Sequence, residues 1–256
     1  MKTIQKTAII IPCYNEANRL DRQAFIDFIQ DHPDYLLCFV NDGSSDDTIS
    51  VLYEIKDAQD DQIHVLDMPR NSGKAAAVRA GALYLSESTE ASYIGFIDAD
   101  LSTDFEDFKA ITEKLYSDEK LDVVYGSRNK CEGSNIDRDF FRSILSNIVK
   151  AFIYLILRLP IEDTQCGAKV FRKSIIGTAF GMPFQTKWLF DVEIFIRLKR
   201  YYSPDHVMNH IYEQPLVRWV HVDDSRLGAK DAIQIPMKLM MIWYKYNLTS
   251  QLTKAA

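Results

Sequence analysis

The sequence has few cysteines, no excess of positive charge and no zinc-type cysteine pair. Its 256 residues carry a formal net charge of −6, with a pI near 5.4. Phosphate backbones require a basic surface, so nucleic acid is disfavoured as the main partner. The four cysteines are scattered without a Cys-x-x-Cys pair, which indicates neither a zinc site nor a disulfide framework. Reduced thiols fit a cytoplasmic protein.

Long apolar runs are also missing. No stretch approaches the roughly 20 residues that a membrane-spanning helix needs. The nearest candidate, residues 148–159, is broken by Lys150 and Arg158. Residues 1–12 have neither the apolar segment nor the cleavage site of a signal peptide. We therefore expect a chain that does not cross a membrane, and leave open a peripheral contact with the cytosolic face of the inner membrane.

The first half of the chain alternates short apolar runs with helical patterns. This alternation predicts a parallel sheet covered by helices on both faces, with ligands at the carboxyl ends of the strands. The predicted strands are residues 7–11, 35–40, 63–66, 93–97 and 123–125, and the predicted helices are residues 21–30, 48–58, 74–86 and 105–116.

The second half is less regular. Its patterns predict helices at residues 140–159, 191–201 and 233–252, and strands at residues 168–172, 207–213 and 217–220. Repeats and long linkers are missing. We therefore expect a single domain over residues 1–256, with a nucleotide-binding half at about 1–127 and an acceptor half at about 128–256.

Polar residues follow the first two predicted strands. Pro12 is expected to stop the first strand, and Tyr14, Asn15 and Glu16 come next. The second strand is followed by Asp42, whose carboxylate can accept a hydrogen bond from a nucleoside base. Turns and helix caps have similar sequences, so neither segment alone establishes a function.

The third strand leads into Lys74 at the start of a helix. Free N–H groups there, together with the lysine, suit an anion. The segment is not a P-loop, because Met68 and Ala75 replace the glycine and the hydroxyl residue that this motif requires. The dinucleotide-binding pattern Gly-x-Gly-x-x-Gly is missing too.

The fourth strand leads into Asp98, Ala99 and Asp100. Two carboxylates separated by one residue at a strand end repel each other unless a cation lies between them. A hard divalent ion would fit there and would bring phosphate oxygens with it.

These segments together resemble the signature of family 2 inverting glycosyltransferases. The first-half motifs are residues 10–16 (IIPCYNE), 40–46 (VNDGSSD), 71–74 (NSGK) and 98–100 (DAD). Residues 124–128 (VYGSR), 163–171 (DTQCGAKVF) and 188–193 (WLFDVE) resemble the dolichyl- and polyprenyl-phosphate glucosyltransferase and mannosyltransferase branch, the glucosyl enzymes above all. The match extends over about residues 6–227.

The resemblance implies an α/β fold of the GT-A type: a Rossmann-like, mixed, mainly parallel sheet with helices on both faces. It implies transfer of a hexose, glucose from UDP-glucose, to a polyprenyl phosphate. The nucleotide-sugar residues it implies are Pro12, Tyr14, Asn15, Glu16, Asp42, Lys74, Asp98 and Ala99. By the same resemblance Asp98 and Asp100 would hold Mg²⁺ or Mn²⁺, and Asp100 would also be catalytic. The eukaryotic glucosyl enzymes carry an N-terminal membrane anchor, and we expect none in this protein.

The acceptor half offers cations and one further carboxylate. A lipid phosphate is already anionic and needs cations to position it, for which Arg128, Arg138 and Arg142 are candidates. Arg128 and Arg142 match positions that bind the lipid phosphate in the polyprenyl-phosphate branch. A hydroxyl acceptor would instead need a base, and Asp163 is then the candidate.

Several alternatives stay open at this stage. Asp191 and Glu193 either bind sugar hydroxyls or are ordinary polar positions of a helix. His221, with Asp223 and Asp224, could approach the diphosphate. The acceptor could be a glycan hydroxyl, and the protein could also be a non-catalytic sugar-nucleotide binder or a nucleotidyltransferase. Residues 148–159 and 235–248 mix apolar side chains with lysine or arginine, so these helices either touch a membrane surface, pack on the sheet or bury their faces in a homodimer.

Overall fold

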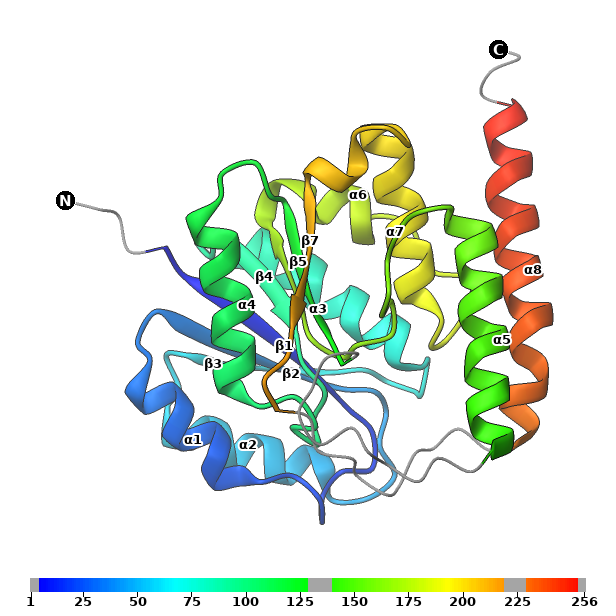
Figure 1. Cartoon of the computed structure of the whole chain (residues 1–256). Helices are drawn as coiled ribbons and strands as arrows, with labels where there is room; N and C mark the ends of the chain where they lie inside the picture. The colour runs from blue at the N-terminus through cyan, green and yellow to red at the C-terminus, as the bar shows by residue number, and fades with distance from the viewer. Residues whose placement is uncertain (1–4, 129–139, 219–228, 253–256) are drawn as a thin grey trace.

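The computed structural model describes residues 5–128, 140–218 and 229–252. In the helix at residues 140–157 it describes the side chains from residue 149 onward, and in the helix at residues 229–252 it describes those of residues 234–247. A seven-stranded sheet in the order β3-β2-β1-β4-β6-β5-β7 forms its centre (Figure 1). The strands are β1 (Thr7–Cys13), β2 (Tyr35–Asn41), β3 (Ile63–Asp67), β4 (Tyr93–Phe96), β5 (Val123–Ser127), β6 (Lys169–Arg172) and β7 (Ile211–Pro215).

All neighbouring strands pair in parallel except at β6, which is antiparallel to both β4 and β5. The sheet is therefore mixed and mainly parallel, which confirms the predicted α/β fold class. The strand β6 comes from the second half of the chain, yet it lies between two strands of the first half. The two halves consequently share one sheet.

Helices cover both faces of this sheet. One apolar cluster joins it to α1 (Arg22–Asp31), α2 (Thr48–Ala58) and α4 (Phe105–Ser117). The other joins it to α3 (Lys74–Ser88), α5 (Phe140–Leu157), α6 (Ile176–Phe180), α7 (Phe190–Tyr202) and α8 (Ala229–Leu252). Short 3-10 helices, η1 (Lys173–Ile175) and η2 (Val207–Asn209), complete the described elements.

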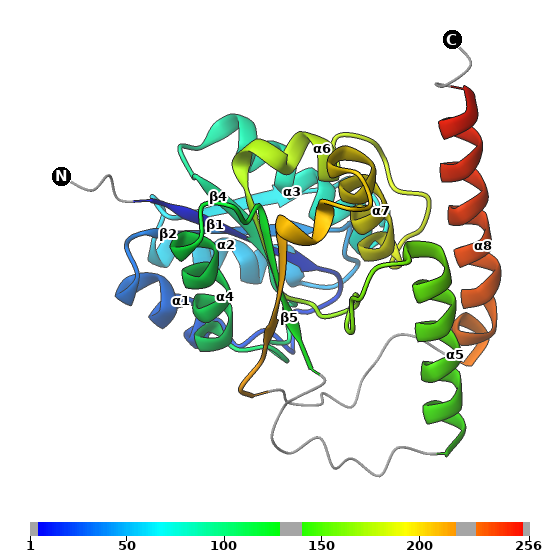
Figure 2. The ribbon, with the colours of Figure 1, turned by 45° about the horizontal axis from the view of Figure 1, so that its top comes forward.

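The helices α5 and α8 lie side by side at one end of the molecule (Figures 1 and 2). Ile235, Leu239 and Ile242 of α8 are buried against the core. The outward faces of the two helices expose large apolar side chains: Tyr154, Leu155, Met237, Met240, Met241, Trp243 and Tyr244. Among the helices of the described ranges, none combines the length and apolar character that crossing a bilayer demands.

Several predicted boundaries were wrong. Strand β1 continues through Pro12 to Cys13, because the pairing of β1 with β4 ends at Ile10 and leaves Pro12 beyond that ladder. Residues 207–213 form η2 and then β7, not one strand. Residues 217 and 218 are not in a strand, and residues 219 and 220 lie outside the described part. The α6 and η1 helices had no distinct signal in the sequence.

Candidate functional site

The loops after β1 and β2 are held together by reciprocal hydrogen bonds. The Asn15 N–H donates to Ser44 Oγ at 2.9 Å, and the Ser45 N–H donates to Asn15 Oδ1 at 2.8 Å. Asn15 adopts a left-handed conformation with φ of 51°, which asparagine tolerates better than most residues. The Glu16 N–H donates to Thr48 Oγ1 at 2.8 Å. The two predicted nucleoside-binding segments thus form one rigid rim at the carboxyl ends of β1 and β2.

Asp42 lies at the end of β2 as predicted, but its carboxylate is already engaged. Its two oxygens accept hydrogen bonds from the N–H groups of Ser72 and Gly73, both at 2.7 Å, and Asp42 is only 3% exposed. The Ala75 N–H donates to the carbonyl of Lys187 at 2.9 Å. We expected free N–H groups at the start of α3, and this was wrong for Ser72, Gly73 and Ala75. The first two bind the Asp42 carboxylate, and the third binds the Lys187 carbonyl.

Gly73 allows the segment before α7 to approach this loop. Its φ of 94° favours glycine, and a Cβ atom there would lie 2.7 Å from the Lys187 Cβ. The backbone bond from Ala75 to Lys187 lies beside this contact. The segment of residues 181–189, here called the bridging segment, therefore forms one wall at the start of α3.

Asp98 lies two residues beyond β4 and faces Lys74. The Lys74 ammonium donates to Asp98 Oδ1 in an ion pair. The other oxygen, Oδ2, packs against Gly167, where a Cβ atom would lie only 2.2 Å away. Asp100 Oδ1 accepts a hydrogen bond from the Ser102 N–H at 3.0 Å. The structure therefore brings Asp98 and Lys74 into contact, whereas the sequence analysis assigned both to the nucleotide-sugar site without predicting this ion pair.

Ala99, between the two aspartates, points the other way. It is 7% exposed and packs in the apolar cluster beneath α1, α2 and α4. Any contact of Ala99 with a nucleotide sugar would have to come from its backbone. Pro12, Tyr14 and Glu16 are partly buried along the rim formed by the first two loops.

A buried ion pair that the sequence analysis missed lies beside Asp98. Lys169, fully buried in β6, places its ammonium 2.7 Å from Asp191 Oδ1 at the start of α7 and donates to the Cys166 carbonyl at 2.6 Å. Burial raises the pKa of Asp191, while Lys169 and Lys74 oppose that rise. A lysine inside the apolar strand residues 168–171 was the signal, since a buried cation needs a partner.

Arg128 and Asp163 form a second ion pair near the site. The Arg128 Nε and Nη2 groups donate to the two oxygens of Asp163 at 2.7 and 2.8 Å. Asp163 is 6% exposed, and although burial works against its charge, the hydrogen bonds and charge of Arg128 hold its pKa below the ordinary value. Glu213 of β7 fixes this corner by accepting from the N–H groups of Glu162 and Asp163, both at 2.9 Å.

A pocket of about 320 Å³ opens beside this pair, between the loop of residues 161–165 and the helices α5 and α8. Its apolar wall is formed by Val149, Ile153, Ile161 and Ile235. Arg128 and Lys150 supply cations, and Glu162 and Asp163 supply carboxylates. An elongated apolar molecule with an anionic end would find both surfaces that it needs in this pocket.

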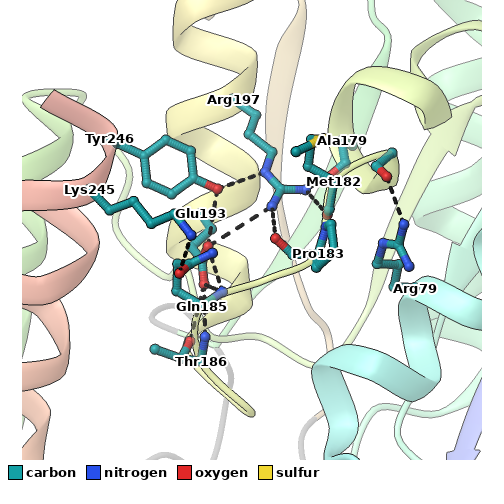
Figure 3. A network of polar contacts seen from close by, with 11 residues as sticks. Arg79, Ala179, Met182, Pro183, Gln185, Thr186, Glu193, Arg197, Lys245 and Tyr246 are labelled. Carbon is teal, nitrogen blue, oxygen red and sulfur yellow. Dashed lines mark hydrogen bonds and ion pairs between the residues drawn. The ribbon is translucent and has the colours of Figure 1, made fainter. Parts of the chain in front are cut away.

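Glu193 belongs to a different network of polar contacts (Figure 3). It is fully buried and accepts hydrogen bonds from the N–H groups of Gln185 and Thr186 and from the Tyr246 hydroxyl. Arg197 binds three backbone carbonyls of residues 179–183 and the same Tyr246 hydroxyl. Of the two acids considered for sugar binding, Asp191 lies at the site, whereas Glu193 holds the bridging segment and α8 to α7.

The remaining candidates lie wholly or partly outside the described residues. Arg142 is in α5, but its side chain is not among those described, and Arg138, His221, Asp223 and Asp224 are outside altogether. Lys238 and Lys245 of α8 contact the protein: Lys238 lies over the Trp188 ring, and Lys245 donates to Gln185.

Comparison with known proteins agrees with this geometry. The model of the family described as glycosyl transferase family 2 matches residues 8–180. The chain belongs to glycosyl transferase family 2. It is a glycosyltransferase, and the resemblance predicted from its motifs is confirmed.

Similar curated proteins are named dolichyl-phosphate beta-glucosyltransferase. The protein from Drosophila melanogaster is 31% identical over 254 residues, covering 93% of this chain and 74% of the relative. The protein from Dictyostelium discoideum is 29% identical over 255 residues, covering 94% of this chain and 75% of the relative. This likeness extends over nearly the whole described glycosyltransferase fold.

Among solved structures, glucosyl-3-phosphoglycerate synthase from Mycobacterium tuberculosis has the same fold. One of its crystal structures superposes with a TM-score of 0.69 at 14% identity, covering 94% of this chain and 80% of that one. Another, with Mn²⁺ and uridine-diphosphate-glucose bound, gives a TM-score of 0.68 at 16% identity, covering 94% of this chain and 79% of that one. The fold is therefore that of GT-A glycosyltransferases.

Proposed function

We propose that this glycosyltransferase moves glucose from UDP-glucose to a polyprenyl phosphate of the dolichyl type, with a divalent metal ion at Asp98 and Asp100. The observation that carries the acceptor assignment is the pocket beside Arg128, with its apolar wall and its cations. The names of the similar curated proteins support the sugar and the lipid phosphate.

The residues present fit a hard cation. Asp98 and Asp100 supply carboxylate oxygens at the end of β4, and Gly167 leaves room for Asp98 where any side chain would displace it. No group of three or more such ligands occurs among the described residues. Two carboxylates are enough for Mg²⁺ or Mn²⁺, because such ions commonly complete their coordination with substrate phosphates and water. The bound ion would neutralise the charge that develops on the leaving diphosphate.

The donor would lie along the rim formed by the first two loops. In this proposal Pro12, Tyr14, Asn15 and Glu16 line the nucleoside pocket, and Asp42 contributes to base recognition while it fixes the loop before α3. Lys74 is placed to meet the diphosphate beside Asp98. A structure with bound Mn²⁺ and uridine-diphosphate-glucose for a protein of the same fold supports this arrangement.

The state of Asp163 favours a phosphate acceptor over a hydroxyl. A general base works best with a pKa near the working pH. Both oxygens of Asp163 are bound by Arg128, and its pKa is lowered. In the proposed reaction the acceptor phosphate is already ionised, so Asp163 positions the Arg128 guanidinium and no proton has to be removed.

The test is a transfer assay with UDP-glucose, a polyprenyl phosphate and Mn²⁺, for the wild type and for the double variant Arg128→Met/Arg142→Met. We expect transfer that stops with excess chelator. The double variant should lose at least about tenfold in kcat/KM for the lipid, because it lacks the cations that orient the phosphate. Slow hydrolysis of UDP-glucose by water should persist, since the donor site is unchanged.

The control is Arg22→Met, which removes a surface arginine paired with Glu54 on the far face. It should behave as wild type. Normal lipid transfer by the double variant would remove the two arginines from the mechanism. Transfer to a glycan hydroxyl with none to the lipid would contradict the acceptor assignment.

A further inference from the structure

The ion pair between Lys74 and Asp98 joins two residues that the proposed function assigns to different ligands. Asp98 is proposed to bind the metal, and Lys74 to bind the diphosphate. In the structure their side chains bind each other instead. The two side chains are about one-third exposed, at 36% and 30%, so they remain reachable from the site.

The surroundings of Asp98 reinforce this pairing. Its Oδ2 packs against Gly167, and Lys74 donates to the other oxygen, Oδ1. Lys74 itself is the first residue of α3, directly after the loop that Asp42 fixes.

From this geometry we infer that Lys74 acts as a latch: it holds Asp98 while the donor site is empty and transfers to the diphosphate when metal and donor arrive together. The inference rests on the proposed metal and donor sites and adds a binding order to them.

The physical reason is charge repulsion. A divalent cation bound to Asp98 would lie close to the Lys74 ammonium, and like charges at such range disfavour each other. A diphosphate between them offers oxygens to both and removes the repulsion. Metal alone should therefore bind weakly, and metal and nucleotide should each strengthen the binding of the other by the same factor.

The test measures Mn²⁺ binding directly, from the electron paramagnetic resonance signal of free Mn²⁺, with and without UDP. For the wild type, we expect UDP to tighten Mn²⁺ binding by about tenfold or more, within the usual range of coupling between two sites. Lys74→Met should change the two affinities in opposite directions. Mn²⁺ alone should bind several-fold tighter than to the wild type, whereas UDP in the presence of Mn²⁺ should bind weaker, by roughly tenfold.

Three further variants make the result specific. Lys74→Arg keeps the charge and should resemble the wild type for Mn²⁺ alone, and Lys74→Gln should repeat the changes of the methionine variant. Lys56→Met, which removes a surface lysine paired with Asp60, should change neither affinity. General damage to the fold would weaken the binding of both Mn²⁺ and UDP, and it would lower the temperature of thermal unfolding.

The outcomes distinguish a failure of the Lys74 inference from a failure of the proposed function. If both neutral variants bind Mn²⁺ alone no better than the wild type does, the latch is wrong while the donor site stands. If the wild type binds neither Mn²⁺ nor UDP, the proposed donor site fails and the latch fails with it.

Discussion

Charged side chains around the carboxyl edge of the sheet are held by specific partners. Asp42 binds two backbone N–H groups, Lys169 binds Asp191, and Arg128 binds Asp163 through two parallel hydrogen bonds. Side chains fixed in this way lose little additional entropy when a substrate binds. In the proposed function these three parts of the site are arranged before any substrate arrives, whereas Lys74 and Asp98 exchange partners on binding.

The Arg128–Asp163 pair gives a prediction about stability and pH. Asp163→Asn should lower the free energy of unfolding by about 2 kcal/mol at pH 7, less than for a fully buried pair because Arg128 is one-third exposed. Folding lowers the pKa of Asp163, so its contribution is complete above the unfolded value of about 3.9. It is lost as the pH falls through the lower, folded value.

The measurement is urea unfolding of the wild type and the variant between pH 3 and pH 8. The difference between them should stay constant above about pH 5 and shrink toward pH 3. Asp60→Asn, at an exposed carboxylate paired with Lys56, serves as the control and should change little at any pH. A difference that grows on acidification would show that Asp163 has no lowered pKa.

At the residue scale, the sequence predicted positions better than partners. Asp42, Asp98 and Lys74 lie at strand ends and a helix start, which hydrophobic periodicity can locate. That Asp42 binds the loop before α3, or that Lys169 reaches Asp191, depends on contacts between segments distant in the chain. Spacing within one segment carries no information about such contacts, although a lysine inside an apolar strand does indicate that a partner exists.

At the scale of elements, α8 has two faces with different tasks. Ile235, Leu239 and Ile242 pack into the core, while Met240, Met241 and Trp243 are exposed. The Tyr246 hydroxyl joins the same helix to Glu193 and Arg197 (Figure 3). The inner face therefore fixes α8 to the fold and leaves the outer face available.

Adjacent residues of α8 provide a matched pair of variants. Leu239→Ala should lower the free energy of unfolding by about 2–4 kcal/mol, because it removes a fully buried side chain. Met240→Ala, one position along and 63% exposed, should change it by less than about 0.5 kcal/mol. Urea unfolding of both variants measures the contrast, and equal losses would mean that the helix does not pack in this orientation.

The predicted boundaries of strands were likewise accurate where they depend on local sequence and inaccurate where they depend on a distant segment. Strands with continuous apolar runs, such as β2, were predicted within one residue. The end of β1 was missed, since the effect of Pro12 depends on where the neighbouring strand stops. The antiparallel direction of β6 could not be predicted from the sequence either, because the pattern of a four-residue strand has no direction.

At the scale of the whole molecule, we propose that the chain is one domain and that its exposed α5–α8 face rests on a membrane. The proposed acceptor pocket is lined by these same two helices, through Val149, Ile153 and Ile235. A polyprenyl tail cannot be drawn far into water, because each exposed methylene group costs about 0.8 kcal/mol. In this proposal the pocket therefore opens close to the bilayer surface.

Liposome flotation tests the membrane contact. The wild type should float with anionic vesicles, whereas Met240→Gln/Trp243→Gln, which changes only exposed positions of α8, should float several-fold less. Because Lys238 and Lys245 already contact Trp188 and Gln185, we expect only a modest effect of salt. Tyr53→Gln, at an exposed aromatic residue of α2, is the control. Equal flotation of all three proteins would exclude this face as the contact.

The position of β6 also has a consequence for the order in which the strands can pair during synthesis. A ribosome delivers β5 before β6, yet β6 is the strand that pairs with β4. The nascent chain therefore carries β4 with one edge unpaired until residues 169–172 emerge, and an unpaired strand edge invites contact with other chains. The same short segment brings in Lys169, so the strand that fills the gap between β4 and β5 also carries the buried cation beside Asp98.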